Sequence, residues 1–182
     1  MNYRWSELLA QETITAAGTK TVDIDLADPI SRISVLKKLT NTNVAPTAHP
    51  AAVLPKLEIV DGSDVLFSLN GYEINALNFY ERSLPPFMTL IYLNDVMALI
   101  EFDINFGRCL YDPMLALDPR KFKNPQLKIQ HSLALGGCAP DSMDLRIRAD
   151  LFDKKQVEPI GFLMAKEHFN YSLVSSGNEY ID

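Results

Sequence analysis

Cysteine, tryptophan and long apolar runs are scarce in this sequence, and each shortage excludes a class of protein. The 182 residues include only two cysteines, Cys109 and Cys138, and one tryptophan. Two cysteines without CxxC spacing do not make a disulfide scaffold, and they fit synthesis in a reducing cytoplasm. The longest apolar runs fall short of the roughly 20 residues that cross a bilayer. The first residues, MNYRWSELLAQET, lack the pattern of a secretory signal. We therefore expect a soluble chain.

Clustered positive charge is also missing. The chain has 17 Lys and Arg against 23 Asp and Glu, which gives a formal net charge of -6. No run of Lys or Arg is longer than two residues. A general nucleic-acid surface needs clustered positive charge to neutralise phosphates. The sequence therefore predicts no direct nucleic-acid partner.

Residues 56–81, KLEIVDGSDVLFSLNGYEINALNFYE, predict a strand, a tight turn, a second strand and a helix. Apolar residues alternate with polar ones on both sides of Asp61-Gly62, a dipeptide that tolerates positive φ in a hairpin turn. Asn70 can cap a helix, and Glu73, three residues later, can complete a capping box. Pro85-Pro86 then ends the helix. The rest of the chain is organised around this unit.

Alternation with a period of two recurs along the rest of the chain and predicts further strands. The clearest strand covers residues 100–106, where four apolar residues alternate with three polar ones. Residues 4–11 instead predict a short helix in an N-terminal arm that spans residues 1–12. Asp112-Pro113 and Asp118-Pro119 each predict a short helical turn. The other expected strands cover 13–15, 22–26, 30–39, 88–94, 127–133, 145–151 and 161–174, and residues 40–55 predict a long loop.

About eight strands and one helix, without regularly alternating long helices, exclude a doubly wound parallel sheet. The predicted fold class is all-β: an eight-stranded antiparallel jelly-roll sandwich with one short helix and an N-terminal arm. We expect this jelly roll to span residues 13–168. The last twelve residues, YSLVSSGNEYID, align without a gap on ETITAAGTKTVD, with Gly177 on Gly18. Residues 169–182 are therefore interpreted as the truncated start of a second jelly-roll repeat.

Two blocks of the sequence, LEIVDGSDVLFSLNGYEINALNFYE and FDINFGRCLYDPMLALDPRKFKNPQLKI, carry a specific resemblance. They resemble major capsid proteins of the double jelly-roll lineage, and within it the corticovirus-like coat proteins of tailless, membrane-containing icosahedral phages. The resemblance implies a structural virion protein without enzymatic activity, whose homotrimers form pseudo-hexagonal capsomers of an icosahedral shell. This chain departs from the lineage because it holds one complete barrel. We therefore expect it to be the N-terminal jelly roll of a longer coat protein.

The same resemblance implies partners and a location. The expected partners are other copies of the chain, neighbouring capsomers, minor capsid or penton proteins, and an internal membrane reached through the N-terminal arm. The expected location is the virion capsid, after synthesis in the host cytoplasm. An alternative is a single jelly-roll module that binds a carbohydrate or a receptor, such as a vertex spike or penton protein. Such a module needs an exposed aromatic residue at a cleft, and the only tryptophan is Trp5.

Contacts between barrels would use material outside the sheets. The segment 108–125 places four positive charges in an otherwise acidic chain, and these charges suit either an acidic neighbouring surface or a solvated loop. The interface candidates are Trp5, Leu8, Arg108, Arg120, Lys121 and Lys123.

No cofactor is expected, apart from calcium at one of two carboxylate groups. Asp61 and Asp64 flank Gly62-Ser63, and Asp23, Asp25 and Asp28 lie near a strand end; both groups offer the oxygen ligands that Ca²⁺ prefers. Turn geometry alone also explains Asp61, because its side chain can bond to the backbone. The alternation of Asp23 and Asp25 equally indicates a solvated sheet face.

A catalytic site is not expected. Ser34 and Lys37 match an S-x-x-K pattern, but they fall on opposite faces of a predicted strand, whereas a serine acylase needs the pattern at the start of a helix. His131 lies on a predicted apolar face, where a hydrogen-bonded core histidine is the commoner explanation. No two histidines share a strand at the spacing of metal ligands, which argues against a cupin-type enzyme.

Overall fold

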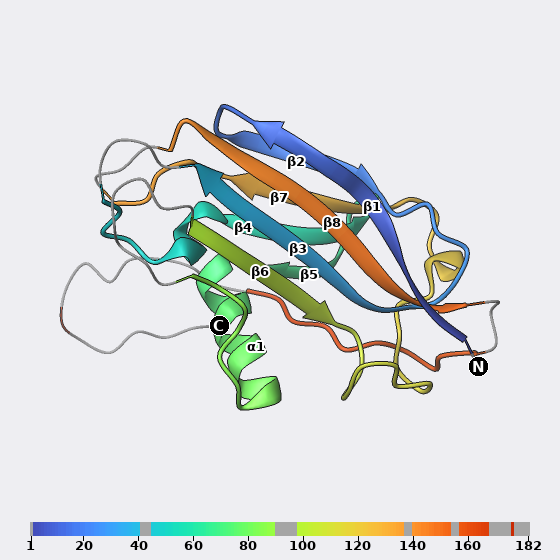
Figure 1. Cartoon of the computed structure of the whole chain (residues 1–182). Helices are drawn as coiled ribbons and strands as arrows, with labels where there is room; N and C mark the ends of the chain where they lie inside the picture. Colours follow the sequence, from blue (N-terminus) through green and yellow to red (C-terminus); the bar gives the residue numbers. More distant parts are fainter. Residues whose placement is uncertain are drawn as a thin grey trace.

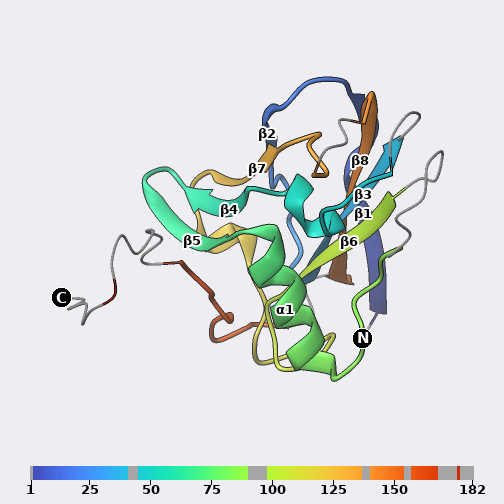
Figure 2. The ribbon, with the colours of Figure 1, turned by 90° about the vertical axis from the view of Figure 1, so that its left-hand side faces the viewer.

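The structure is a computed structural model that describes residues 2–40, 45–89, 98–136, 140–153, 157–167 and 176. Within these residues, eight strands form two four-stranded antiparallel sheets that face each other (Figures 1 and 2). The first sheet has the order β1-β8-β3-β6, with β1 (Asn2–Ile14), β8 (Ser142–Asp153), β3 (Ile30–Thr40) and β6 (Ala98–Asn105). The second has the order β2-β7-β4-β5, with β2 (Gly18–Asp23), β7 (Pro125–His131), β4 (Lys56–Asp61) and β5 (Asp64–Leu69).

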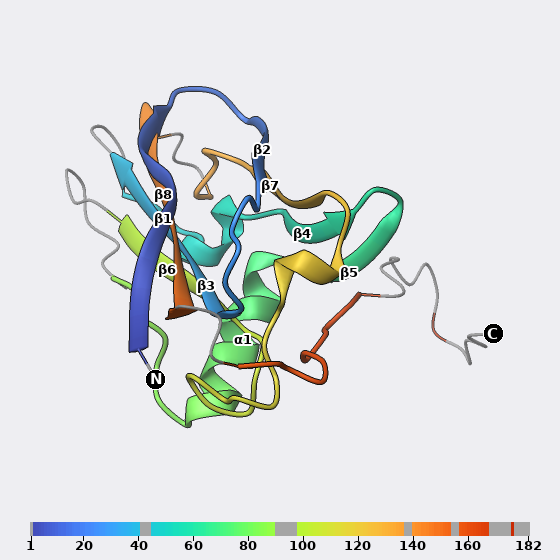
Figure 3. The same cartoon turned by 90° about the vertical axis from the view of Figure 1, so that its right-hand side faces the viewer.

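The connections between the strands are those of a jelly roll. The chain changes sheet at every connection except the hairpin between β4 and β5, so strands distant in sequence become neighbours. The view from the right-hand side shows the two sheets as separate layers, with the hairpin of β4 and β5 projecting from the second one (Figure 3). The predicted all-β, eight-stranded jelly-roll sandwich is therefore confirmed.

The core lies between the sheets and is built from the predicted alternating residues. Val35 of β3 pairs with Phe102 of β6 on one side and with Ile147 of β8 on the other, and all three side chains are fully buried. Leu57, Ile59, Leu127 and Ile129 fill the core from the second sheet. Burial of these apolar side chains is the main stabilising contribution to the sandwich.

The unit at residues 56–82 forms as predicted. Gly62 takes a φ of 62° in the turn between β4 and β5, a conformation that glycine adopts without strain. Helix α1 (Gly71–Arg82) begins with the predicted capping box, in which the Asn70 side chain accepts from the Glu73 amide at 3.0 Å and the Glu73 carboxylate accepts from the Asn70 amide at 2.8 Å. The helix ends at Ser83, whose φ of 53° closes the last turn.

The predicted helix at residues 4–11 is wrong, because these residues belong to strand β1. This strand pairs with β8 along its whole length, and the pairing register shifts between Glu7 and Leu9 and again between Leu9 and Glu12. Each bulge breaks the period of two, so the apolar residues of this strand acquire the spacing of a helix. The N-terminal arm is thus an edge strand of the first sheet.

Three other predictions need correction or fall outside the described residues. Asp118 caps the short 3₁₀ helix η2 (Pro119–Lys121) as predicted, but Asp112 caps a turn without a helix. Residues 161–167 form isolated bridges at Gly161 and Lys166 rather than the predicted strand. The predicted loop at 40–55 contains the 3₁₀ helix η1 (Pro50–Val53). Several predicted features lie outside the described residues: most of the expected strand at 88–94, Cys138, His168 and most of the proposed repeat at 169–182.

The two flanks of the sandwich differ in how their edge strands are covered. The edge of β6 is covered by residues 87–89 and by Asn78 of α1, whose side-chain amide bonds both backbone groups of Asp103 at 2.7 and 3.0 Å. The edge of β5 is covered by residues 165–167, which bond both backbone groups of Ser68. In the described part of the chain, no segment pairs with the outer edges of β1 and β2, which form the opposite flank (Figure 1). No described helix is long and apolar enough to span a bilayer.

Candidate functional site

A network of charged side chains lies on the face of the first sheet that points away from the core. It is centred on Asp103 of β6, whose carboxylate accepts from the Ser34 hydroxyl at 2.5 Å, from Arg32 at 3.3 Å and from Arg82 at 2.7 Å. Arg32 also donates to Asp150 of β8 at 2.7 Å. The Asp103 side chain is only 9% exposed, so these contacts replace water around it. The network connects helix α1 to three strands of the sheet.

The charges of this network shift the pKa values of their neighbours. Burial alone would lower the pKa of Arg32, but the charges of Asp103 and Asp150 outweigh it and raise that pKa. Burial, and then the charge of Asp103, raises the pKa of Glu101, which is paired with Arg148 at 3.3 Å. These shifts mark a partly desolvated polar surface rather than an ordinary solvated sheet face.

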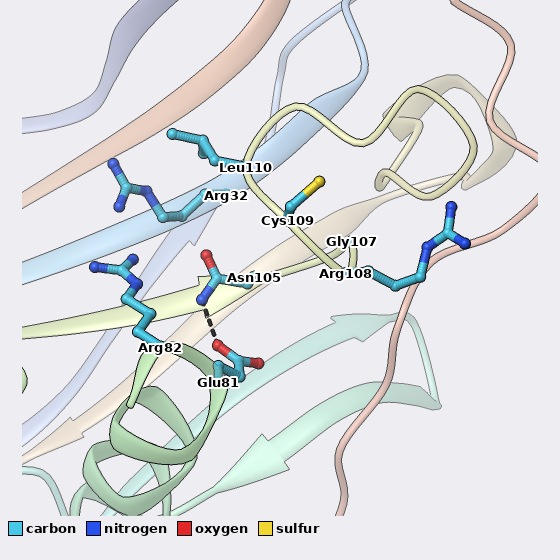
Figure 4. Close-up of a pocket in the computed structure, with 8 residues that line it drawn as sticks. All are labelled: Arg32, Glu81, Arg82, Asn105, Gly107, Arg108, Cys109 and Leu110. Atoms are coloured by element: carbon cyan, nitrogen blue, oxygen red, sulfur yellow. Dashed lines mark hydrogen bonds between the residues drawn. The ribbon is translucent and has the colours of Figure 1, made fainter. Parts of the chain in front are cut away.

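A cleft of about 370 Å³ opens beside this network, between the end of α1 and the loop after β6 (Figure 4). The Asn105 amide donates to Glu81 at 2.5 Å across its lower side, and burial raises the pKa of Glu81. The cleft is lined by Arg32, Glu81, Arg82, Asn105, Gly107, Arg108, Cys109 and Leu110. Figure 4 shows that the Arg108 side chain points away from the others. The cleft thus presents guanidinium and amide donors together with the exposed thiol of Cys109.

Two of the predicted interface arginines are paired within the chain. Arg108 donates to Asp112 at 2.7 Å, and this bond lowers the pKa of Asp112 to about 2. Arg120 donates to Asp118 at 2.6 Å, and this bond likewise lowers the pKa of Asp118. The Arg108 side chain is nevertheless 68% exposed, so a neighbouring molecule can still reach it. The structure therefore gives both arginines a local role in ordering the loop.

The two predicted interface lysines lie in the same loop but are used differently. The Lys121 ammonium donates to the Pro159 carbonyl at 2.5 Å and so ties the loop to the segment 157–167. The backbone amide of Lys123 donates to the Asp61 carboxylate at 3.2 Å. The positive segment is thus a folded loop whose charges are partly balanced by its own chain.

The two candidates in β1 have different environments. Trp5 is 58% exposed, whereas Leu8 is half-buried and packs against the core. Leu8 therefore has a structural role in the sandwich. Beside Trp5 lies a shallow depression of about 90 Å³, lined by Trp5, Arg32, Ser34, Arg148 and Asp150. Among the described residues that line it, Trp5 is the only aromatic one.

The calcium candidates do not converge on one point. The Asp61 carboxylate accepts from the backbone amides of Lys123 and Asn124, the latter at 2.7 Å, and so orders the start of β7. Asp23 accepts from the Gln126 side chain at 2.7 Å, and Asp28 pairs with Arg4 at 2.8 Å. In the described ranges, no three His, Cys, Asp or Glu side chains form a group that could hold a metal ion. Asp64 is exposed at the hairpin, and Asp25 is also exposed.

The S-x-x-K residues and His131 lie where the alternation predicts. Ser34 bonds to Asp103 on the outer face, whereas Lys37 points into the core and is fully buried. His131 is 8% exposed, and its Nε2 bonds to the Ala16 carbonyl at 3.1 Å. The hydrogen-bonded core histidine is confirmed.

Sequence reasoning missed two residues that matter here. Asn78 follows Ile74 by one helical turn, so its place on the buried face of α1 could have been inferred from the 3.6-residue period. Its partner, the backbone of Asp103, could not, because that contact depends on the packing of the helix against β6. The full burial of Lys37 was also missed, although its position opposite Ser34 implied it.

The fold and the network together define a jelly-roll domain with one helix set against an edge of its first sheet. No protein-family model matches the sequence, and no curated protein matches it. Solved structures of viral major capsid proteins do share the fold. The major capsid protein of STIV matches with a TM-score of 0.65 at 14% identity, over 84% of this chain and 49% of that protein.

Two further matches are structures from PBCV-1. The structure of PBCV-1 VP54, fitted into a reconstruction of the virophage Sputnik, matches with a TM-score of 0.55 at 16% identity, over 84% of this chain and 43% of VP54. The PBCV-1 capsid model matches with a TM-score of 0.53 at 17% identity, over the same shares of both chains. This chain therefore spans less than half the length of each of these proteins. At such low identity, the matches establish the fold that the chain shares with these capsid proteins.

Proposed function

We propose that this chain is a structural virion protein, the N-terminal jelly roll of a major capsid protein that assembles as a trimer into pseudo-hexagonal capsomers of an icosahedral shell. The observation that carries the proposal is the match over 84% of this chain to about half of a viral major capsid protein. A match of one jelly roll to half of a longer chain is what a protein with two such domains would give. The repeat of Gly18 at Gly177 in the sequence supports the same interpretation.

The surface of the domain supports a role in contacts between copies. The flank of β1 and β2 leaves two strand edges without partners in the described residues, and such edges in a soluble protein are normally protected. Large apolar side chains are also exposed on the opposite flank, on α1 and the loops beside it; they are Phe79, Tyr80, Leu84, Phe87, Leu110, Met114, Ile160, Leu163 and Met164. Exposed apolar side chains commonly mark an interaction site where they gather on one face. Both flanks are thus suited to contact with neighbouring barrels or with an internal membrane.

The oligomeric state of the complete gene product tests the proposal. Size-exclusion chromatography with light scattering is expected to give three times the mass of one chain, and electron microscopy of the same fraction is expected to show a pseudo-hexagonal outline. Phe87, 62% exposed, offers a matched probe. Its change to Asp should weaken the trimer without unfolding the domain, because the side chain contributes little to the core. A complete gene product that stays monomeric at micromolar concentration would contradict the proposal.

A second candidate function, binding of a carbohydrate or a receptor, is favoured by one observation. Trp5 is 58% exposed and lines a depression together with arginine and aspartate side chains. Such a combination offers an aromatic surface for a sugar ring and hydrogen-bonding groups for its hydroxyls. If this function is real, glycan-array binding by the chain should be lost in Trp5→Ala and kept in Phe87→Ala. Absence of binding to any glycan would leave the capsid function as the one supported.

A further inference from the structure

Lys37 is an unusual residue to find in the core of a β sandwich. It lies in the middle of β3 and is among the largest fully buried side chains of the described chain. Among the described residues, its ammonium nitrogen has one hydrogen-bond partner, the Val53 carbonyl of η1, at 2.9 Å. A buried lysine without a carboxylate is costly when charged, because the charge has lost its water and gained only one acceptor.

The Val53 carbonyl joins three parts of the fold at this point. Besides Lys37 of the first sheet, it accepts from the backbone amide of Ser132 at 3.1 Å, directly after β7 of the second sheet. The backbone amide of Thr47, which lies before η1, also donates a hydrogen bond to the Leu135 carbonyl at 3.2 Å. The η1 helix is therefore held between the two sheets by bonds that converge on the turn after β7.

A second base lies beside this junction. His131 precedes Ser132, and its Nε2 bonds to the Ala16 carbonyl, while its buried Nδ1 has no partner. The bond at Nε2 places the proton of the neutral ring on that atom. A second proton would have to go to the buried Nδ1, which makes no hydrogen bond in the described part of the chain. Charging His131 would therefore bury a second cation close to the first.

The titratable groups that act on the pair from neighbouring strands include Lys20, whose ammonium is paired with the Glu12 carboxylate at 2.5 Å. Lys20 of β2 and Lys37 both lower the pKa of His131, after burial, which has the largest effect. His49 lies at the N-terminus of η1, and burial lowers its pKa as well. Burial lowers the pKa of Lys37 from 10.5 to about 7.

We propose that Lys37 and His131 form a pH-sensitive latch that holds η1 between the two sheets when both bases are neutral and releases this end of the sandwich when they take up protons. In the part of the chain that the structure describes, protonation gives Lys37 three donors for a single carbonyl and puts a proton on the unpaired, buried Nδ1 of His131. Opening of η1 and of the turn after β7 admits water to both groups. The inference does not depend on the capsid function, because it concerns the domain alone.

The direction of the pH dependence follows from the two protonation equilibria. The folded-state pKa of Lys37 lies below its unfolded value, so the closed state loses stability as the pH falls from 10.5 to about 7. The pKa of His131 is lowered from 6.5, so a further loss begins below that pH. Each pH unit within such a window changes the opening equilibrium about tenfold. The latch therefore loosens in two steps, one for each base.

Hydrogen exchange of the full chain, corrected for the intrinsic effect of pH on exchange, tests the latch. The opening equilibrium of residues 50–54 and 131–135 is expected to rise about 100-fold between pH 9 and pH 7. Lys37→Met should abolish this rise, because methionine cannot take up a proton. The Val53 carbonyl still keeps its bond from Ser132 in this variant. Lys38→Met, a change in the neighbouring lysine on the outer side of β3, should keep it. His131→Gln should remove only the rise below pH 6.5.

Two outcomes would overturn the latch. One is an opening equilibrium of residues 50–54 that is unchanged between pH 9 and pH 7, and the other is a Lys37→Met variant that opens like the unmodified chain. Should a variant fail to fold, nuclear magnetic resonance of the unmodified chain decides the question. The Lys37 side chain is expected to titrate far below pH 10.5, and titration near that value would refute the proposal.

Discussion

Replacing Asp103 with alanine is expected to lower the free energy of unfolding by about 3 kcal/mol, which is the low end of the cost of removing one partner from a buried ion pair. The Asp103 carboxylate is 9% exposed and is shared by Arg32, Arg82 and the Ser34 hydroxyl. Without it, Arg32 keeps its bond to Asp150, but the buried Ser34 hydroxyl loses its acceptor. Urea unfolding should show a lower midpoint with an unchanged slope.

The neighbouring residue on the same face supplies the control for Asp103. Asn105 also makes a side-chain bond to α1, through Glu81, but this bond lies at the exposed end of the strand. Asn105→Ala is expected to change the unfolding free energy by less than about 1 kcal/mol. The loss of unfolding free energy in Asp103→Asn should lie between those of Asp103→Ala and Asn105→Ala, since an amide oxygen can still accept from Ser34. Equal losses of unfolding free energy in Asp103→Ala and Asn105→Ala would show that Asp103 contributes no more to stability than Asn105 does.

Phe102→Ala is expected to lower the free energy of unfolding by about 3–5 kcal/mol, the usual cost of truncating a buried phenylalanine. Phe102 is fully buried and lies opposite Val35 in the register of β6 and β3. The cost combines the lost transfer of the ring out of water with the cavity that it leaves. A marginally stable domain can lose its cooperative unfolding altogether at that cost. Calorimetry and urea unfolding of the same sample measure the loss.

Phe87→Ala is the matched control, because the chemical change is identical and Phe87 is 62% exposed. Its effect on the unfolding free energy is expected to stay within about 0.5 kcal/mol. The backbone bond between the Phe87 carbonyl and the Glu101 amide is untouched by the change. A loss as large as that of Phe102→Ala would mean that the loop at Phe87 is part of the core, contrary to its exposure.

The parts of the fold that depend on neighbouring residues could be predicted from the sequence. The Asp61-Gly62 turn, the capping box at Asn70 and the alternation along β6 each depend on residues that are close in sequence, and all three are confirmed. Local propensity and side-chain pattern agree at these places, so one structure is favoured.

The parts that depend on distant residues could not be predicted. Strand β1 was interpreted as a helix because its bulges exist only in partnership with β8, more than a hundred residues away. The bond between Asn78 and the backbone of Asp103 joins residues 25 positions apart and has no signature in either segment. The alternation of β3 places Lys37 on the inner face, but its bond to the Val53 carbonyl joins residues 16 positions apart and could not be predicted.

The candidate site could likewise be predicted only in part. The candidate residues at 108–123 do lie in one folded loop, as their spacing implied, but the pairing of Arg108 with Asp112 and of Arg120 with Asp118 gives them a local role. The charged network around Asp103 was not predicted, because its members come from three strands and a helix. Polar residues on an outer face indicate contact with solvent, and only the register shows that they converge.

The unequal covering of the four edge strands limits how copies of this domain can join through their backbones. Growth of a continuous sheet from molecule to molecule needs an available edge at each end of the same sheet. In the described residues, the first sheet is available only at β1 and the second only at β2, because Asn78, residues 87–89 and residues 165–167 occupy the other ends. Pairing of β1 with β1, or of β2 with β2, would therefore stop at two copies, because no further edge of the same sheet is available among the described strands.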